Sequence, residues 1–373
     1  MDYLKKYGIP KFINAHDTIT LYGGSRMSGE IYRAMEQISS CFTDMILLQR
    51  ILGERIAKMT HNEGAYIAGS AAGALQLCAA VAMCREDAYC YRKLPDTENC
   101  RKEILVLHGQ YHCYLKAMEA AGARLKLVGD ADEVILEDLE REIGERTAAI
   151  VYTPAAPFRR SSPELEEVAE IARRKGCLLI VDAAAQLPPV SNLWTFCERG
   201  ADLAIFSGGK SLMGPQTSSL IVGKKEYIEL CIQYGSPNHG ICRSAKTSRE
   251  SMIGLCVAVE AYMERDHEKE YAAWSAMADR MVEMLAVGRY RPRRVETGSV
   301  GQTYPRVFIE LSDGLSAGDV QKKMYRKRIF VGADVKANQI YLSPQNLTEE
   351  ECDAVIRALL EVERMGKSGE GVS

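Results

Sequence analysis

The sequence predicts an α/β fold, with a mostly parallel sheet sandwiched by helices and a smaller C-terminal α+β domain. Between about residues 104 and 222, short and almost fully apolar segments alternate with helical ones. This alternation is typical of parallel strands covered by helices on both faces. The 373 residues leave room for about two domains. We expect an N-terminal segment at 1–25, a large domain at 26–255 and a small domain at 256–373.

The N-terminal part begins with a glycine-punctuated lead that we expect to wrap over another element or a neighbouring subunit. Helices are predicted at 28–40 and 44–60, followed by a Gly69-Ser70 turn that opens a small-residue helix. The unpaired backbone N–H groups of such a helix start can bind an anion. Close packing through the alanines explains the composition equally well. The polar stretch 84–103 is predicted to be an exposed excursion.

The central elements follow from apolar runs and helix-end signals. Ser162 is the predicted N-cap of one helix, with Pro163 at its first position, and Lys175-Gly176 is its predicted end. The predicted strands are Ile104–Leu107, Arg124–Val128, Ala148–Thr153, Leu178–Val181, Leu203–Phe206 and Ser218–Val222. The predicted C-terminal elements are helices at 247–265, 268–287, 316–327 and from 348, and strands Val307–Leu311, Ile329–Val331 and Gln339–Leu342.

Charge and composition exclude several classes of protein. A net charge of −3 gives no electrostatic reason to expect nucleic acid as a partner. No apolar run reaches the length of a membrane span, and the N-terminus lacks an apolar signal core, so we expect a cytoplasmic location. The 12 cysteines form no Cys-x-x-Cys pair. Reduced, mostly buried thiols and no metal site are therefore expected.

Lys210 follows a buried strand and the turn Ser207-Gly208-Gly209. The glycines allow a bulky group to approach the backbone. A lysine in this position suits a Schiff base to an aldehyde cofactor, although Gly-Gly-Lys turns without that role are common.

Other polar residues join Lys210 at the predicted carboxyl edge of the sheet, where ligands of such folds bind. Asp182 ends the preceding strand, 28 residues earlier, which suits one helix and one strand between them. Pyridoxal 5′-phosphate needs a lysine, a carboxylate at its ring nitrogen, donors for its phosphate and a cover for its ring. Asp182 supplies the carboxylate, and the Ser70 turn supplies the donors for the phosphate. His112, or alternatively Gln110, supplies the cover for the ring.

The stretches Val181–Gln186 and Asp202–Gln216 resemble those of fold-type I pyridoxal phosphate enzymes. Within this fold type, the resemblance is to enzymes similar to the class V aminotransferases. The resemblance is closer to the group around bacterial selenocysteine synthase and D-glucosaminate-6-phosphate ammonia-lyase. It extends over about residues 10–265 and includes Ile13–Ala15, Leu21–Ser25 and Arg243–Leu255. It implies an aspartate aminotransferase-like fold with a seven-stranded type of sheet and a site at the interface of a homodimer or higher homo-oligomer.

The resemblance also implies residue roles. Lys210 forms the Schiff base and Asp182 pairs with the ring nitrogen. The remaining cofactor residues are Ser70, Ala71, Ala72, Ala184 and Ser207. The stretch Leu342–Leu347 stands where related small domains often carry an arginine, so the substrate carboxylate is assigned to Arg26, Arg159 (or its neighbour Arg160) or Arg243. Arg243 or Lys246 would reach a neighbouring subunit's site, unless they are solvated surface charges.

The function implied is that of a pyridoxal phosphate lyase. Lys210 removes the α-proton of an amino acid or 2-amino sugar acid, a β-substituent leaves, and ammonia and a 2-oxo acid are released. The same carbanion also serves a selenium or sulfur transferase, an aminotransferase or a racemase, and a non-catalytic cofactor-binding protein is the rival from another class. The chain begins almost at the catalytic domain, without the tRNA-binding domain of selenocysteine synthase, so a small molecule is the expected substrate.

Overall fold

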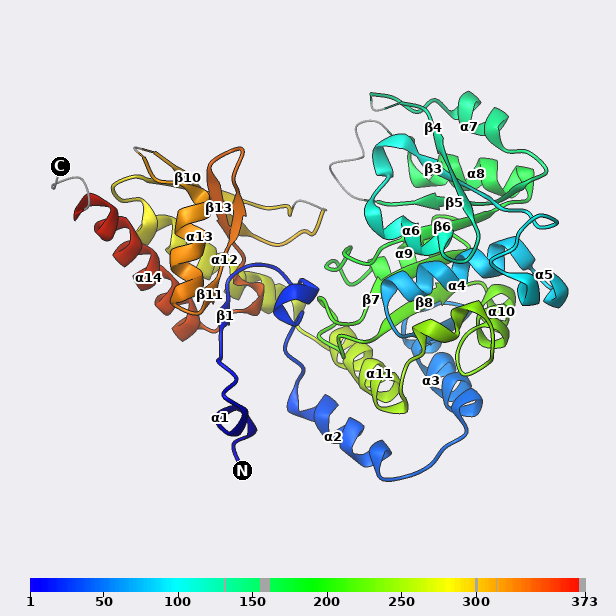
Figure 1. Ribbon diagram of the computed structural model, residues 1–373, viewed down its shortest axis with the longest axis horizontal. Helices are drawn as coiled ribbons and strands as arrows, with labels where there is room; N and C mark the ends of the chain where they lie inside the picture. The colour runs from blue at the N-terminus through cyan, green and yellow to red at the C-terminus, as the bar shows by residue number, and fades with distance from the viewer. Residues whose placement is uncertain (131, 155–161, 299–300, 313, 369–373) are drawn as a thin grey trace. The chain divides into compact units, whose positions relative to one another are not determined.

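The computed structural model describes residues 1–130, 132–154, 162–298, 301–312 and 314–368, and the chain folds into two compact units (Figure 1). The terminal unit comprises Met1–Gly24, Asp266–Gly298 and Thr303–Ser373, and the sheet unit comprises Ser25–Arg265 and Ser299–Gln302. No helix among the described residues is both long and apolar enough to cross a membrane.

The sheet unit is built on a seven-stranded sheet in the order β2-β8-β7-β6-β5-β3-β4. Only β8 runs antiparallel to its two neighbours, β2 and β7, so the predicted fold class is confirmed. The strands are β2 (Gly64–Ala68), β3 (Glu103–Leu107), β4 (Arg124–Val128), β5 (Thr147–Tyr152), β6 (Leu178–Asp182), β7 (Leu203–Ser207) and β8 (Ser219–Gly223).

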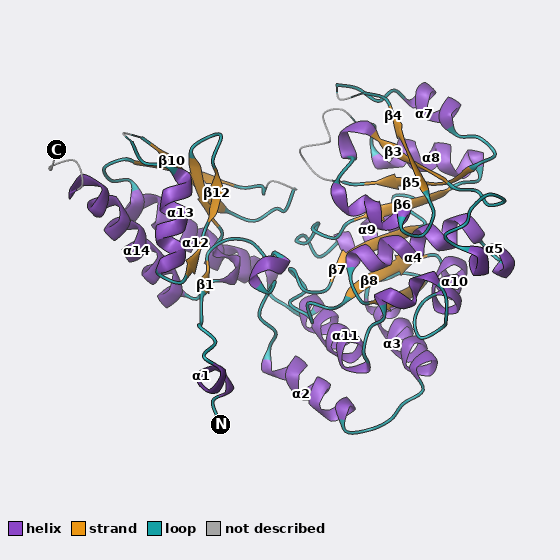
Figure 2. Ribbon diagram, in the orientation of Figure 1, coloured by secondary structure: helices purple, strands orange, loops and turns teal. Residues whose placement is uncertain are grey.

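Helices cover both faces of this sheet (Figure 2), and each face has its own hydrophobic core. One core includes side chains of α3, α8, α9 and α11, and the other includes those of α4, α5, α6 and α10. The helices are α2 (Gly29–Ser39), α3 (Met45–Met59), α4 (Ala71–Cys84), α5 (Ala88–Lys93), α6 (Lys116–Glu119), α7 (Leu136–Glu142), α8 (Leu165–Lys175), α9 (Asn192–Glu198), α10 (Lys225–Tyr234) and α11 (Arg249–Met263), with 3₁₀ turns η2 (His108–Gln110), η3 (Cys113–Leu115) and η5 (Ile241–Ala245).

The start of α8 differs from the prediction that Ser162 caps it. The N-cap is Glu164, whose side chain accepts from the backbone of the first turn while Glu167 Oε2 accepts from the Glu164 N–H at 2.9 Å. This reciprocal capping box satisfies donors at both positions, so the helix begins later. The predicted end is confirmed, because Gly176 adopts φ 69° and closes the helix.

The stretch 84–103 is less exposed than expected, because α5 packs its Cys90 and Tyr91 inward. Tyr91 stacks on Tyr234 with ring centroids 4.1 Å apart. Cys90 forms a disulfide with Cys100, so the expectation of reduced cysteines is wrong for this pair. The other ten cysteines carry free thiols, seven of them buried.

The terminal unit contains a four-stranded antiparallel sheet in the order β12-β13-β10-β9, together with a parallel pair, β1 and β11. The N-terminal segment therefore belongs to the fold of the C-terminal residues. The elements are α1 (Tyr3–Tyr7), β1 (Ile13–Asn14), η1 (Thr20–Tyr22), α12 (His267–Leu285), β9 (Tyr290–Val295), β10 (Arg306–Leu311), α13 (Ala317–Arg326), β11 (Ile329–Phe330), β12 (Gly332–Asp334), β13 (Gln339–Leu342), η6 (Pro344–Asn346) and α14 (Glu349–Ser368).

Candidate active site

Asp182 and the turn that carries Lys210 lie at the same edge of the seven-stranded sheet. Asp182 is the last residue of β6, and β6 runs parallel to β7, which ends at Ser207, three residues before Lys210. Asp182 is 7% exposed, and its Oδ1 accepts a hydrogen bond from the Ala184 N–H at 3.1 Å. Parallel strands end at one edge, so the spacing in the sequence translates directly into proximity.

His112, in the loop after β3, faces the Asp182 carboxylate. Its Nε2 lies 3.4 Å from Asp182 Oδ2 and 3.2 Å from Thr153 Oγ1. With its proton on Nε2, the imidazole donates towards the Asp182 carboxylate and leaves Nδ1 as an acceptor. Nδ1 is buried and has no hydrogen-bond partner within the described part of the chain. An unsatisfied buried polar atom beside a carboxylate marks a place where a further polar group belongs.

The electrostatics of His112 connect it to both neighbouring charges. Burial is the largest influence and lowers the pKa of the imidazole from 6.5. The Asp182 carboxylate opposes this effect, and the Lys210 ammonium adds to it. Lys210 is thus close enough to act on His112, and the imidazole is neutral at pH 7.

Gln110 braces the loop that carries His112. It is 1% exposed, and its Oε1 accepts a hydrogen bond from the Thr153 N–H at 2.6 Å. Of the two residues considered as a ring cover, His112 faces Asp182, whereas the Gln110 carbonyl is engaged by the backbone. Thr153 itself was not among the predicted site residues, and its only signal is a polar side chain directly after a buried strand.

The loop from Ser207 to Gly214 holds Lys210 in a tight backbone turn. The Gly208 N–H donates a hydrogen bond to Ser218 O at 3.0 Å, and the Gly214 N–H donates one to Gly208 O at 2.8 Å. A Cβ atom at Gly208 would overlap Ser218 Oγ, so the close approach requires glycine here. Ser207, the last residue of β7, is half-buried and pairs with Ser219.

Ser70 caps α4, and its Oγ accepts from the Gly73 N–H at 3.0 Å. The cap leaves Ala71 and Ala72 in the first turn, whose N–H groups have no acceptor within the helix. Their partial positive charge suits a phosphate. The backbone of Ala245 packs closely against the residue before this helix. A Cβ atom added at Gly69 would lie only 2.7 Å from Ala245 O.

The structure describes two of the three arginines that were assigned to the substrate carboxylate, Arg26 and Arg243. Arg26 is exposed, but its neighbour Ser25 donates from N and Oγ to Gly209 O at 3.1 and 3.0 Å, which ties Arg26 to the turn that carries Lys210. Arg243 is half-buried in η5, the 3₁₀ turn that packs on the start of α4. Arg159, like Arg160, lies outside the described residues.

These residues match the needs of one cofactor. An imidazole with an open Nδ1, a buried carboxylate, a lysine-bearing turn and a capped helix start all follow strands that end at the carboxyl edge of the sheet. Pyridoxal 5′-phosphate has a ring nitrogen, an aldehyde and a phosphate to place against such groups. The fold and this edge define the class of fold-type I pyridoxal phosphate enzymes.

A family model described as "SelA: L-seryl-tRNA selenium transferase" matches residues 49–297, and the chain belongs to this family. It is therefore an enzyme, and its cofactor is pyridoxal 5′-phosphate.

Two relatives match almost the whole chain. D-glucosaminate-6-phosphate ammonia lyase from Salmonella typhimurium is 26% identical and covers 96% of this chain and 97% of its own. A solved structure of D-glucosaminate-6-phosphate ammonia-lyase superposes with a TM-score of 0.84 at 25% identity, over 98% of this chain and 99% of its own. 5′-C-glycyluridine monooxygenase-decarboxylase from Streptomyces is 28% identical over 97% of this chain and 92% of its own.

A third type of relative matches only in part. The L-seryl-tRNA(Sec) selenium transferase of Desulfovibrio desulfuricans is 25% identical, over 63% of this chain and 49% of its own. The similarity therefore spans about half the length of that relative.

Proposed function

We propose that the chain is a pyridoxal phosphate-dependent lyase that acts on an amino acid or 2-amino sugar acid and releases ammonia and a 2-oxo acid. The observation that carries this proposal is the full-length similarity to an ammonia lyase, in sequence and in fold with a TM-score of 0.84. The similarity to a selenium transferase, in contrast, spans about half of that relative.

In this proposal, Asp182 holds the cofactor's ring nitrogen, and its position beside His112 supports the assignment. Ser70, Ala71 and Ala72, together with Ser207, bind the phosphate through the helix start and the end of β7. His112 covers the ring face, Gln110 fixes its loop, and Ala184 completes the cofactor site. When bound, pyridoxal phosphate supplies an electron sink for the charge that remains after loss of a substrate proton.

Lys210 is the proposed base for the substrate's α-proton. Its ammonium interacts with His112, and a neutral imidazole there adds no second positive charge beside it. Departure of a β-hydroxyl then gives a product that hydrolyses to ammonia and the oxo acid.

Arg26, Arg159 and Arg243 are the proposed ligands of the substrate carboxylate. The tether from Ser25 to Gly209 supports Arg26, and the packing of η5 on the start of α4 supports Arg243. A guanidinium pairs with a carboxylate through two parallel hydrogen bonds, which fixes the orientation of a substrate.

A second copy of the chain is the proposed partner. The side chains of Phe42, Leu47 and Ile51 are 99%, 55% and 54% exposed in the sheet unit. Neighbouring exposed apolar side chains of this size commonly mark an interface between proteins. Light scattering tests this homodimer. The purified wild type should have the mass of a dimer, and Leu47→Lys should shift it towards the mass of a monomer. A monomeric mass for the wild type would contradict the proposal.

Two other outcomes are favoured by particular observations. Membership in the selenium transferase family supports a reaction in which a selenium or sulfur nucleophile takes the place of the departed β-substituent. The Streptomyces relative, whose name describes a monooxygenase-decarboxylase, supports a reaction that consumes oxygen. An aminotransferase or a racemase would use the same first proton transfer.

The experiment is a panel of β-hydroxy amino acids and 2-amino sugar acids, with and without phosphate groups, incubated with the holoenzyme. Ammonia and a 2-oxo acid in equal amounts, without added oxo acid, thiol donor or oxygen, support the lyase. A requirement for an added oxo acid indicates an aminotransferase, a requirement for a sulfur or selenium donor indicates a transferase, and oxygen consumption indicates an oxygenase. Each of these three results contradicts the proposal.

A further inference from the structure

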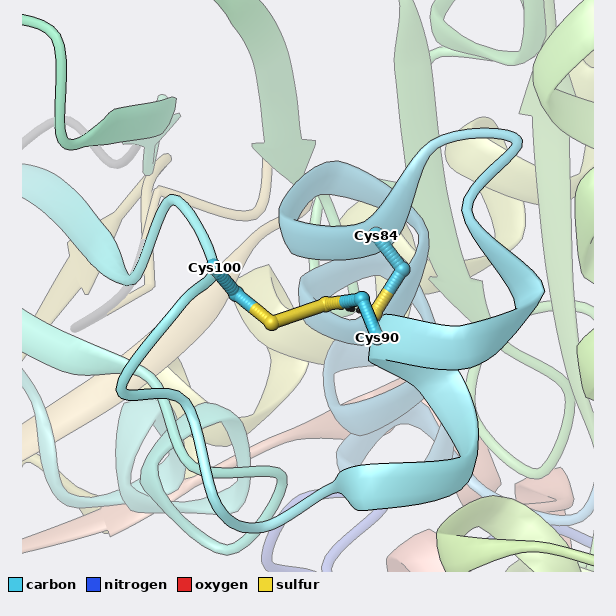
Figure 3. A group of neighbouring side chains, drawn as sticks. All are labelled: Cys84, Cys90 and Cys100. Atoms are coloured by element: carbon cyan, nitrogen blue, oxygen red, sulfur yellow. Dashed lines mark hydrogen bonds between the residues drawn. A yellow bond between two sulfur atoms is a disulfide. The ribbon is translucent and has the colours of Figure 1, made fainter.

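Three cysteine sulfurs meet at the end of α4, the helix whose start is capped by Ser70 (Figure 3). Cys90 and Cys100 form a disulfide, and Cys84 Sγ lies 3.0 Å from Cys90 Sγ. All three sulfurs lie within 4.8 Å of one another. The Cys90 sulfur thus has one covalent partner and one free thiol in contact with it.

From this arrangement we propose that Cys84, Cys90 and Cys100 form a thiol–disulfide exchange site in which Cys90 is shared between two alternative disulfides. The Cys84 thiolate attacks Cys90 Sγ, the Cys90–Cys100 bond breaks, and Cys100 leaves as a thiolate. One disulfide and one thiol are present before and after, so the exchange needs neither an oxidant nor a reductant.

The surrounding side chains set which disulfide is the resting one. Cys84 and Cys90 are 3% and 6% exposed, whereas Cys100 is half-buried. Burial, with a smaller contribution from the Asp87 carboxylate, raises the pKa of the Cys84 thiol to about 12. Cys84 is therefore mostly protonated at neutral pH and attacks only through a small thiolate fraction, so exchange is slow and Cys90–Cys100 is the resting disulfide.

A cavity of about 420 Å³ gives small molecules access to the sulfurs, because Cys84, Cys90 and Cys100 all line it. Its wall also contains Arg85 and Arg101, against a single carboxylate from Asp87. Arg85 Nε is buried without a hydrogen-bond partner in the described part of the chain. The chemistry fits a small anionic thiol or disulfide, whose carboxylates the two arginines would attract.

Such a molecule also accounts for formation of the disulfide from reduced protein. The half-buried Cys100 thiolate attacks a small disulfide and releases one small thiol. Cys90 then attacks the Cys100 sulfur of the mixed disulfide, and the second small thiol leaves. The two electrons lost by the protein reduce the small disulfide to two thiols.

Three neighbouring sulfurs are also a candidate metal site, since cysteine thiolates bind zinc. The covalent bond between Cys90 and Cys100 removes two of the three sulfurs from such a role. The structure therefore favours exchange, and zinc binding is an outcome that the experiment has to separate from it.

The experiment uses the full-length holoenzyme, oxidised glutathione as the anionic probe, and disulfide mapping by mass spectrometry. In the native wild type, an excess of iodoacetamide captures Cys100 each time exchange releases it, so the Cys84–Cys90 disulfide accumulates at the expense of Cys90–Cys100. In Cys100→Ser, oxidised glutathione is expected to produce Cys84–Cys90, with loss of the alkylatable Cys84 thiol. In Cys84→Ser, the Cys90–Cys100 bond forms and iodoacetamide leaves it intact.

The matched control is Cys256→Ser, which removes another buried thiol of the sheet unit and is expected to leave the disulfide map unchanged. Persistence of Cys90–Cys100 in alkylated wild type, or free Cys84 and Cys90 in oxidised Cys100→Ser, would overturn the proposal. Binding of one zinc ion per reduced chain that prevents oxidation by glutathione would also overturn it and assign a metal site. The wild-type arm does not depend on whether the variants fold.

Discussion

His112 Nε2 lies 3.4 Å from Asp182 Oδ2 and ties the loop after β3 to the end of β6. The Asp182 carboxylate attracts a proton to the imidazole, yet burial and the Lys210 charge outweigh it, and the pKa of His112 is lowered. A neutral histidine beside a carboxylate can cover the ring of a cofactor without competing with the ring nitrogen for the negative charge. The proposed chemistry depends on this pair.

Asp182→Asn should reduce turnover by about 100-fold or more, because the amide keeps the shape but cannot hold a proton on the ring nitrogen. The matched control is Asp202→Asn. Asp202 directly precedes β7, at the opposite edge of the sheet, and its Oδ2 accepts a hydrogen bond from the Leu179 N–H at 2.8 Å. That variant should lose about 1–3 kcal/mol of stability yet retain turnover per folded molecule. Equal losses of turnover in the two variants would assign Asp182 a structural role only.

The pKa of His112 predicts a dependence of stability on pH. The folded value lies below 6.5, so the unfolded chain binds the proton more tightly. The stability contributed by neutral His112 is complete above pH 6.5 and is lost as pH falls from there through the folded value. Urea unfolding should show a smaller loss on acidification for His112→Gln than for wild type, whereas His239→Gln, at an exposed histidine, should match wild type.

Ser70→Ala should cost about 1 kcal/mol of stability through loss of the N-cap. It should also weaken pyridoxal phosphate binding, because the same helix start is the proposed phosphate site. Asp44→Ala removes the cap of α3, where Oδ1 accepts from the Ile46 and Leu47 N–H groups at 2.9 and 3.0 Å. Denaturant unfolding should give similar costs for both, and cofactor titration should be altered for Ser70→Ala alone.

Gly208→Ala should destabilise the protein by about 1–3 kcal/mol, because the new Cβ overlaps Ser218 Oγ and shifts the turn before Lys210. Gly144→Ala is the control, since a Cβ atom there meets nothing within 4 Å. Unfolding midpoints and cofactor loading should both fall for Gly208→Ala and stay near wild type for Gly144→Ala. A neutral Gly208→Ala would show that the turn tolerates displacement.

The sequence was informative wherever the strand pattern determines proximity. Asp182 and Lys210 follow neighbouring apolar strands, and the end of each strand fixes which edge its polar successor joins. The fold class follows from the same alternation. The strand β2 was less visible, because its five buried residues run directly into the apolar helix α4 and show no separate periodicity.

Features that depend on loop conformation or on distant packing could not be predicted. The hydrogen bond from the Thr153 N–H to Gln110 joins two loops that are 43 residues apart. The cap of α8 depends on whether Ser162 or Glu164 finds a partner, which composition alone does not decide. Cys90 lies on α5 and Cys100 in the loop before β3, and their spacing in the sequence matches no disulfide or metal motif.

The proposed mechanism requires a covalent link between Lys210 and pyridoxal phosphate. The most direct measurement is borohydride reduction of the holoenzyme, followed by proteolysis and mass spectrometry of every lysine-containing peptide. We expect the mass of the reduced cofactor on Lys210 alone, and loss of the visible absorption band in Lys210→Ala. Cofactor mass on another lysine, or an unchanged band in Lys210→Ala, would contradict the account.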